Sequence, residues 1–307
     1  MEQQFIMMIG ISGSGKSYFA NKIADKGGHT IIESDAIREE QYGNAMIQGD
    51  NVKLFAYIQN LIEEKLLDGE SVVFDATNIS HKYRRACIQK IISLKILVEK
   101  KAILVATPVE DCVRNNSERE RTIPENVIRR QLMGYAPPSY REGFDKIEII
   151  WNLTRDSLAE FDIPDLLDGL DDFDQNNENH EFTLGKHIRT THGYAKELST
   201  RGDIYYASLL HDIGKPATKV EHTMKGVPTK NSHYYGHESY GAYLAMFYLT
   251  QKGLTDGFIL ETCLLIALHM RPYFMKSEKS IRKFILQFGE DTYEKILIIN
   301  QADRLAH

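Results

Sequence analysis

The segment FIMMIGISGSGKS occupies residues 5–17 and decides the fold of the first half of the chain. Its apolar part, residues 5–9, has the character of a short strand, and residues 17–26 read as a helix that ends at Gly27-Gly28. Between them lies a complete P-loop pattern, in which glycines let consecutive backbone N–H groups turn inward around phosphate at a helix N-terminus. The order strand, glycine loop, helix therefore predicts a phosphate-binding α/β domain.

Two residues of the loop have specific expected roles. Lys16 would reach the β- and γ-phosphates of a bound nucleotide, and the hydroxyl of Ser17 would bind Mg²⁺. The expected cofactors are thus ATP, or another nucleoside triphosphate, and Mg²⁺. The predicted nucleotide-contacting residues are Gly10, Ser12, Gly13, Ser14, Gly15, Lys16 and Ser17.

Beyond the loop, strand-like and helix-like segments alternate as far as residue 151. Residues 29–33, 71–74, 101–106 and 147–151 read as strands, and apolar residues recur with a helical period over residues 52–67. Strands separated by helical spans predict a parallel sheet with helices on both faces.

Charged residues follow the second and third strands, where open α/β sheets place ligand-binding groups. Asp35 can take the proton of an attacking hydroxyl as a general base, and Arg38, one turn later, can grip an acceptor phosphate. Asp75 would order Mg²⁺ or the acceptor. The alternative interpretation is that both carboxylates cap helices and that Arg38 is solvated.

A basic segment, residues 114–130, follows the fourth strand and can close over a triphosphate. Arg119 and Arg121 are both candidates for contact with the donor phosphates. Arg129 and Arg130 fit the solvated face of an amphipathic helix better.

The motifs GISGSGKS, SDAIR, DATN and RNNSERERTIP together resemble the polynucleotide kinase family over residues 5–152. The resemblance implies that Asp35 is the general base, that Arg38 contacts the phosphate on the acceptor side, and that a lid arginine touches the donor phosphates. Arg119 fits the lid position with a shift of one residue, and Arg121 is the other candidate. The same core also occurs in kinases of small molecules.

The second half has a different character. Helical patterns cover residues 184–200, 203–213, 235–251, 256–271, 278–288 and 290–305, and no strand pattern stands out. We therefore expect a P-loop domain over residues 1–155, an acidic linker over 156–178 and an all-α domain over 179–307.

Histidines and aspartates with the character of metal ligands recur along this half: His187, His211, Asp212, His237, His269 and Asp303. Imidazole and carboxylate together suit Mn²⁺, Fe²⁺, Ni²⁺, Co²⁺ or Zn²⁺ better than Mg²⁺.

The segments HDIGKP, GHES and LHM in this order are similar to the HD-domain phosphohydrolases, especially the HD domain attached to bacterial CCA-adding enzymes. The resemblance implies a first metal held by His187, His211, Asp212 and Asp303. His237 and His269 would help to bind a second, bridged by Asp212, and a water activated by metal would be the nucleophile. Lys215 would neutralise substrate phosphate. His192 and His233 lie outside the pattern.

Composition limits the function classes. The net charge is −6, but residues 153–180 alone carry −8, so the rest of the chain carries +2 and a nucleic-acid substrate is not excluded. Three scattered cysteines favour a reducing compartment, and no stretch has the length of a signal or membrane segment. The expected location is the cytoplasm.

The leading hypothesis is a bifunctional end-healing enzyme that phosphorylates 5′-OH ends and removes a 3′-phosphate or 2′,3′-cyclic phosphate. RNA ends are favoured and DNA ends are possible, and the product would suit an RNA ligase as partner. A known bacterial class fuses the two domain types in the opposite order. One rival is a nucleoside or nucleotide kinase fused to an HD nucleotidase. A second is a non-catalytic ATP-dependent switch, against which the intact Lys16, Asp35 and His211-Asp212 argue.

Overall fold

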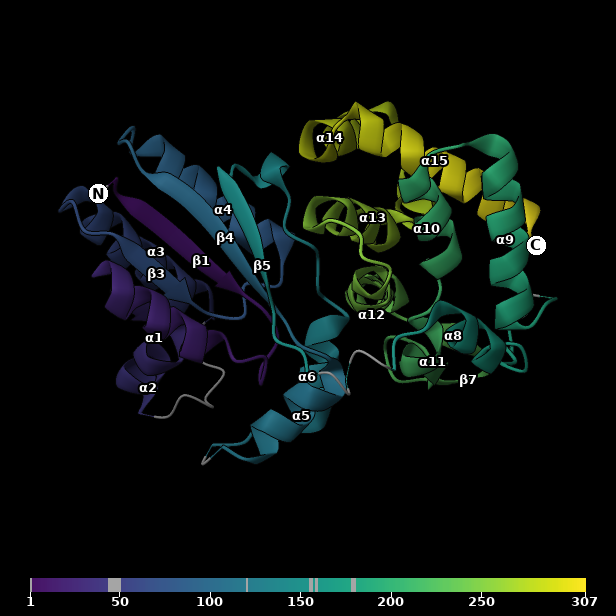
Figure 1. The fold of residues 1–307 in the computed structure, drawn as a ribbon, viewed down its shortest axis with the longest axis horizontal. Helices are drawn as coiled ribbons and strands as arrows, with labels where there is room; N and C mark the ends of the chain where they lie inside the picture. The colour runs from purple at the N-terminus through teal and green to yellow at the C-terminus, as the bar shows by residue number, and fades with distance from the viewer. Residues whose placement is uncertain (1, 44–50, 120, 155–156, 158–159, 178–180) are drawn as a thin grey trace. The chain divides into compact units, whose positions relative to one another are not determined.

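The computed structural model describes residues 2–43, 51–119, 121–154, 157, 160–177 and 181–307. The chain forms two compact units (Figure 1). Unit 1 comprises Met1–Ile128 and Pro138–Leu153, and unit 2 comprises Arg129–Pro137 and Thr154–His307. None of the described helices is long and apolar enough to cross a membrane.

Unit 1 is built on a parallel sheet, as the alternating pattern predicted. Its strands, among the described residues, are β1 (Gln4–Ile9), β2 (Thr30–Glu33), β3 (Val72–Asp75), β4 (Glu99–Ala106) and β5 (Lys146–Trp151). They pair in the order β2-β3-β1-β4-β5. Because β1 is central, the P-loop that follows it lies at the middle of the carboxyl edge of the sheet.

The helices of this half connect the strands. They are α1 (Lys16–Gly27), α2 (Ser34–Tyr42), α3 (Asn51–Leu67), α4 (His81–Ser93), α5 (Val109–Ser117), α6 (Glu125–Leu132) and the 3-10 turn η1 (Tyr140–Glu142). The boundary between the two units falls within α6, after Ile128.

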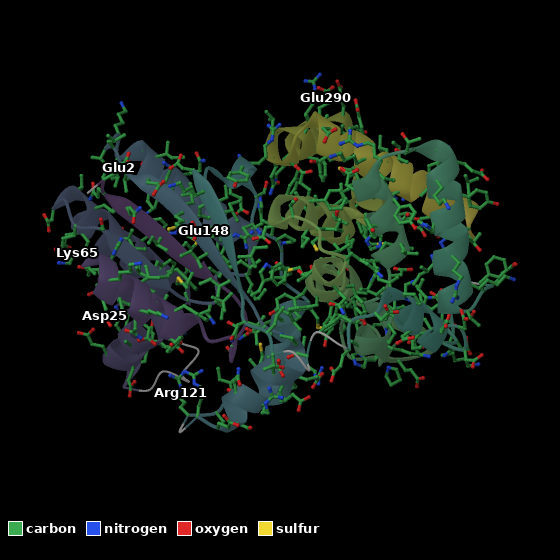
Figure 2. All side chains as sticks on the ribbon, viewed as in Figure 1. Glu2, Asp25, Lys65, Arg121, Glu148 and Glu290 are labelled. Atoms are coloured by element: carbon green, nitrogen blue, oxygen red, sulfur yellow. The ribbon has the colours of Figure 1, made fainter. Side chains whose placement is uncertain are left out.

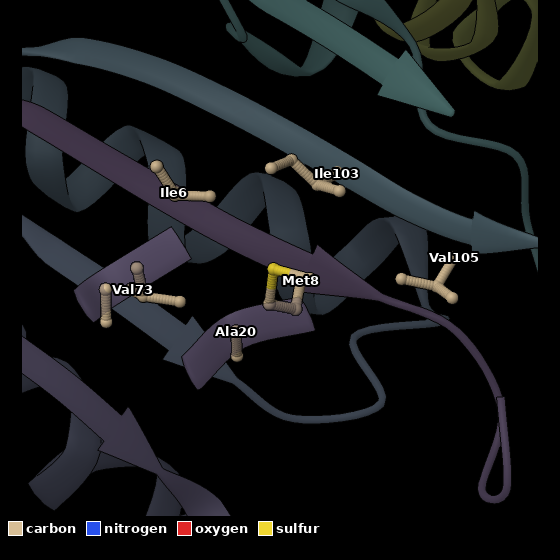
Figure 3. Packing of buried hydrophobic residues seen from close by; sticks show 7 residues of the cluster. Ile6, Met8, Ala20, Val73, Ile103 and Val105 are labelled. Atoms are coloured by element: carbon tan, nitrogen blue, oxygen red, sulfur yellow. The ribbon is translucent and has the colours of Figure 1, made fainter. Parts of the chain in front are cut away.

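Both faces of the sheet are buried. On one face, Ile6 and Met8 of β1 pack with Val73, Ile103, Val105 and Ala20 of α1 (Figure 3). The alternate residues of β1, Phe5, Met7 and Ile9, point to the other face and are fully buried there. The near-continuous apolar run of β1 is typical of a parallel strand covered on two sides.

Unit 2 is helical, as predicted, with one exception. Its helices are α8 (Ile163–Gly169), α9 (Leu184–Leu198), α10 (Gly202–Leu210), α11 (Lys215–Thr218), α12 (His237–Gln251), α13 (Asp256–Leu268), η2 (Arg271–Phe274), α14 (Glu278–Phe288) and α15 (Glu290–Leu305). Helix α10 packs against α9, α13 and α15 (Figure 1). Buried side chains from these four helices, among them Ile188, Leu210, Ile266 and Ile299, form the core.

The exception among the described residues is an antiparallel hairpin of β6 (Lys219–His222) and β7 (Pro228–Tyr234), which the helical patterns did not predict. The pattern missed it because both strands are mostly polar and lack the apolar alternation of a half-buried strand. The turn signal at Lys225-Gly226 was present, since Gly226 adopts a φ of 79° and donates its N–H to Thr223.

The described part of the acidic segment packs with unit 2. Helix α8 lies within it, Leu184 N–H donates to the Phe173 carbonyl at 3.0 Å, and Gly185 N–H donates to Leu170 at 2.9 Å. Gln175 is buried. Residues 155, 156, 158, 159 and 178, at the borders and within the predicted linker, lie outside the described residues.

Candidate phosphate-binding site and metal centre

The P-loop is packed so closely that glycine is required within it. Gly13 has a φ of 82°, and a Cβ there would lie 2.1 Å from the carbonyl oxygen of Cys112 in α5. The backbone of the loop thus rests directly on α5. A side chain at this position would push the loop away from its support and disturb the phosphate cradle.

Side chains from three separate segments hold the loop in shape. The hydroxyl of Thr107 donates to the Ser14 carbonyl at 2.8 Å, and the Asn152 amide donates to the same oxygen at 3.2 Å. The Asn115 amide donates to the Gly13 carbonyl at 3.0 Å. These contacts engage the carbonyls of the loop from behind and hold its backbone in shape.

The hydrogen-bond donors of the P-loop and of the start of α1 fit a nucleotide phosphate. Helix α1 starts at Lys16 without a side-chain cap, so its first N–H groups are available to an anion. Ser14 Oγ is buried and, within the described residues, has no hydrogen-bond partner. Lys16 is buried and donates from Nζ to the Ile11 carbonyl at 2.9 Å. Burial lowers the pKa of Lys16 against the opposing pull of Asp75 and Asp35, and a phosphate would supply the missing counter-charge.

Carboxylates gather at the ends of β2 and β3. Asp75 is buried and ends β3, where it is paired in register with Glu33 at the end of β2, and Asp35 follows in the first turn of α2. Partial burial, together with the charges of Asp75 and Asp35, raises the pKa of Glu33. Sequence analysis missed Glu33, although its place at a strand end was the available signal.

The three candidate arginines of unit 1 have different surroundings. Arg121 forms an ion pair with Asp35, with 3.7 Å between Nη2 and Oδ2, and Figure 2 labels it beside α2. Arg119 is exposed, and its positive charge contributes to lowering the pKa of Lys16. Arg38 is half-buried in α2, one turn after Asp35. Of the two lid candidates, Arg121 is thus the one paired with the predicted general base.

A buried ion pair fixes the loop that carries Asp75. Asn78, at a φ of 46°, donates from its amide to the Met8 carbonyl at 2.8 Å. Arg84 in turn donates to the Asn78 carbonyl at 3.0 Å and binds Glu142 through two 2.8 Å hydrogen bonds, with both side chains fully buried. A bidentate pair of this kind sets geometry more than it adds stability, because desolvation offsets most of the attraction.

In unit 2 the six predicted ligands come together from five segments. His187 lies on α9, His211 and Asp212 directly follow α10, His237 starts α12, His269 ends α13, and Asp303 lies on α15. All six are buried.

Asp212 stands at the centre of this cluster. Its Oδ2 atom lies 3.4 Å from His187 Nε2 and 3.3 Å from His211 Nε2. Its Oδ1 atom lies 3.2 Å from His237 Nε2 and 3.7 Å from His269 Nε2. Asp303 Oδ1 lies 3.1 Å from His187 Nε2. One carboxylate thus faces two groups of imidazoles, and the ligand atoms of each group lie close enough together to be a candidate cation site.

Hydrogen bonds to the backbone set the tautomers. The Nδ1 atoms of His211, His237 and His269 lie 2.7–2.9 Å from carbonyl oxygens three residues earlier. A carbonyl only accepts, so each Nδ1 carries a proton, and each Nε2 faces the cluster, where a bound cation would take the place of any proton on it. Metal-binding histidines are commonly oriented in this way.

The cluster fits a divalent cation. His211 Nε2 is buried and has no hydrogen-bond partner of good geometry among the described residues. Burial disfavours its charged form, but Asp212 and Asp303 outweigh burial and raise the pKa of His211 to about 10. Burial and the nearby His237 lower the pKa of His269 to about 3, so that ring stays neutral. Nitrogen and oxygen donors of this kind suit a transition metal better than Mg²⁺.

Gly214 makes this convergence possible. A Cβ at Gly214 would lie 2.2 Å from the His237 carbonyl oxygen and 2.6 Å from the Gly241 nitrogen. The turn after Asp212 therefore packs backbone to backbone against the first turn of α12. This close approach brings Asp212 and His237 near enough to each other to bind the same cation.

Three further residues were missed by sequence analysis. Tyr273 donates from its hydroxyl to Asp303 Oδ2 at 2.8 Å, and His307 Nε2 lies 3.7 Å from Asp303 Oδ1. Gln175 accepts a 2.7 Å hydrogen bond from Lys215 Nζ. For His307 the signal was its spacing, since residues four apart share a helix face with Asp303. No local pattern marked Tyr273 or Gln175.

Lys215 is buried inside the site, with its ammonium group 2.7 Å from Asp212 Oδ2. It orients the central carboxylate and also lines the pocket described next. His192 stays outside the cluster, where its Nδ1 atom lies 3.1 Å from Ser208 Oγ and its ring lies edge-on to Tyr205.

A pocket of about 630 Å³ opens onto the cluster. Four of the predicted metal ligands line it: Asp212, His237, His269 and Asp303. The remaining lining residues are Asn177, Lys215, His233, Tyr234, Tyr235, Met270, Tyr273, Arg304 and His307. Its volume is in the range of pockets that hold small organic ligands.

Two family models match separate parts of the chain. Residues 5–138 match the family model described as AAA domain, and residues 184–307 match the model described as HD domain. A comparison with curated proteins gives no match.

Several solved structures resemble part of the chain. A gluconokinase from Sinorhizobium meliloti 1021 is 21% identical, with 48% of this chain and 81% of that chain covered and a TM-score of 0.35. The Pnkp1/Rnl/Hen1 RNA repair complex is 18% identical at a TM-score of 0.38, with 42% of this chain and 43% of that chain covered. The APS kinase CysC of Mycobacterium tuberculosis is 18% identical at a TM-score of 0.36, with coverages of 54% and 98%. The chain thus matches an AAA domain in its first part and an HD domain in its second part.

Proposed function

We propose that the protein heals nucleic-acid ends by phosphorylating a 5′-OH with ATP and by hydrolysing a 3′-phosphate or a 2′,3′-cyclic phosphate. The observation that supports the proposal is that one chain carries both a P-loop and a separate cluster of imidazoles and carboxylates. Unit 1 has a buried P-loop lysine beside a carboxylate and an arginine one turn apart. Unit 2 has a cluster of imidazoles around one central carboxylate.

In the kinase reaction, Lys16 stabilises charge that develops on the transferred phosphoryl group. Asp35 accepts the proton of the attacking hydroxyl, which requires that its ion pair with Arg121 yields to the acceptor. Arg38 binds the phosphate on the acceptor side. Arg119 is assigned to the donor phosphates because Arg121 is already paired with Asp35.

In the hydrolase reaction, His187, His211, Asp212 and Asp303 would hold one cation, and Asp212, His237 and His269 would hold a second. A bound cation supplies Lewis-acid activation of water and neutralises phosphoester charge. Lys215 and Tyr273 orient the carboxylates of Asp212 and Asp303. Their hydrogen bonds restrict the carboxylates to the direction that faces the imidazoles.

The test is an end-labelled RNA with a 5′-OH and a 3′-phosphate, together with its DNA equivalent. Each is incubated with ATP and, separately, with Mg²⁺, Mn²⁺, Ni²⁺ or Co²⁺. We expect 5′ phosphorylation with Mg²⁺ and ATP, and 3′-end hydrolysis with a transition metal in the absence of ATP. Failure at both ends, on RNA and on DNA, would refute the proposal.

A second candidate is a nucleoside or nucleotide kinase joined to an HD nucleotidase. The bounded pocket of unit 2 favours it, since about 630 Å³ admits a single nucleotide. The same assay with adenosine, adenosine 3′-monophosphate and short oligonucleotides as acceptors separates the two. Preference for the plain nucleoside would support this second candidate.

A further inference from the structure

Aromatic side chains line the unit 2 pocket beside the predicted metal ligands. His233, Tyr234 and Tyr235 line one part of it, and Tyr273 lines another. None of these residues was assigned a role by the motifs. Aromatic walls next to a phosphoester site suit a substrate that carries a flat ring near its phosphate.

Two of these rings form a parallel stack. The centroids of His233 and Tyr235 lie 5.4 Å apart, with an angle of 8° between the ring planes. Residues two apart lie on the same side of an extended chain, which explains the stacking at the end of β7. Both rings are half-buried, so each retains surface for a ligand.

His233 also carries an unsatisfied polar atom. Its Nε2 is buried and, within the described residues, has no hydrogen-bond partner. A buried polar atom without a partner is costly, and a ligand in the pocket would relieve that cost.

The stack is rigidly connected to the metal cluster. His233 pairs with Val220, and Tyr234 pairs with Lys219 across the hairpin. The Tyr234 hydroxyl donates to the Gln175 carbonyl, and the Tyr234 carbonyl lies 2.7 Å from His237 Nδ1. The hairpin therefore fixes the stacked rings relative to a predicted metal ligand.

We propose that the His233–Tyr235 stack binds the nucleobase of the nucleotide whose phosphate is hydrolysed at the metal cluster. This inference rests on the proposed hydrolase function and specifies its substrate as a nucleotide. The exposed Arg304, which lines the same pocket, supplies positive charge for the phosphates. Because every base has a π-face, the site should accept all bases and reject a ligand without one.

Binding is measured by saturation-transfer NMR and equilibrium dialysis on the full chain in EDTA, so that no turnover occurs. A common background of Arg38→Ala and Lys16→Ala removes nucleotide binding in unit 1. The probes are adenosine 3′-monophosphate, uridine 3′-monophosphate, glycerol phosphate and an RNA tetramer with a 3′-phosphate. The tetramer distinguishes a strand end from a free nucleotide.

Tyr235→Ala should weaken binding of both mononucleotides roughly tenfold, while Tyr235→Phe should retain it. Binding of glycerol phosphate should not change in either variant. The matched control is Tyr205→Ala, which removes a tyrosine that lies edge-on to His192 outside the pocket and should have no effect. With the activating metal, Tyr235→Ala should raise KM for nucleotides more than it lowers kcat.

Two results would overturn the inference. One is an equal loss of glycerol phosphate and nucleotide binding in Tyr235→Ala, and the other is unchanged nucleotide binding in that variant. In either case the hydrolase proposal stands if the wild-type protein cleaves a phosphoester. Conversely, base-dependent binding without hydrolysis under any metal would refute the hydrolase and leave a nucleotide-binding pocket.

Discussion

The Nε2 atoms of His237 and His269 lie 3.3 Å apart. Each ring gives its Nδ1 proton to a backbone carbonyl, so two neutral rings would direct lone pairs at each other. A shared proton or a cation removes that repulsion. The pair is therefore held in a conformation that binding of a metal would stabilise.

Metal loading should accordingly raise the unfolding temperature of the protein. A ligand at 100 times its Kd stabilises the folded state by about 2.7 kcal/mol. We expect Mn²⁺, Ni²⁺ or Co²⁺ to raise the transition in differential scanning calorimetry and EDTA to reverse it. His269→Ala should reduce the shift, and Tyr205→Ala should not. The absence of a shift with every transition metal would refute the metal centre.

Asp35→Asn should lower the rate of 5′ phosphorylation by about 10²- to 10⁴-fold, because the general base is lost while the size of the side chain is kept. ATP binding should persist, since Lys16 and the loop are unchanged. The control is Arg121→Ala, which removes the ion-pair partner of Asp35 but keeps the carboxylate. It shows how much of the rate loss comes from breaking the ion pair and how much from losing the base. Near-normal turnover by Asp35→Asn would rule out the assigned role.

The loss of kinase activity in Arg38→Ala should depend on whether the acceptor carries a phosphate. If Arg38 binds the acceptor phosphate, the variant loses far more activity on a nucleoside 3′-monophosphate than on the plain nucleoside. The comparison is made from kcat/KM for both acceptors at saturating ATP. Equal losses on the two would favour a kinase of small nucleosides.

The two activities should separate by mutation. Asp212→Ala removes the central carboxylate of the cluster and should abolish 3′-end hydrolysis, with 5′ phosphorylation kept within a few-fold of wild type. Lys16→Ala should have the reverse effect. Circular dichroism checks that each variant is folded. Loss of both activities in folded Asp212→Ala protein would indicate one composite site.

Stability should depend on pH through the ion pair of Asp203 and Lys295, which lie 2.8 Å apart and join α10 to α15. Burial opposes the charged form, but Lys295 and Arg201 outweigh it and lower the pKa of Asp203. A lowered carboxyl pKa stabilises the fold above the unfolded value of about 3.9. This stability is lost as the pH falls through the folded pKa.

Asp203→Asn should therefore lower the free energy of unfolding at pH 7, and the difference from wild type should shrink below about pH 4. Denaturant titrations across this range measure it. The pKa of Lys295 is raised against the effect of burial, by Asp203 and Asp291, so its contribution is lost only at strongly alkaline pH. A difference that is constant down to pH 2 would contradict the electrostatic explanation.

The sequence by itself determined the features that depend on neighbours along the chain. The P-loop spacing, the apolar run of β1 and the helical periods of unit 2 predicted a parallel α/β sheet and a helical region, and the structure confirms both. The domain types were predicted from GISGSGKS and HDIGKP, and the family matches confirm them. The polar hairpin of β6 and β7 was not predicted, because its strands lack the alternation of apolar and polar residues.

Only the tertiary structure decided which side chains meet. Three contacts show this: Arg121 with Asp35, Tyr273 with Asp303 and Gln175 with Lys215. The two residues of each pair are 30 to 86 positions apart in the sequence. Such contacts follow from how elements pack, as when Gly214 lets the turn after Asp212 press against the backbone of His237. Local patterns specify which elements form, because hydrogen bonds and periodicity act between near neighbours. The sites exist only where those elements converge, because ligation requires distances that packing alone sets.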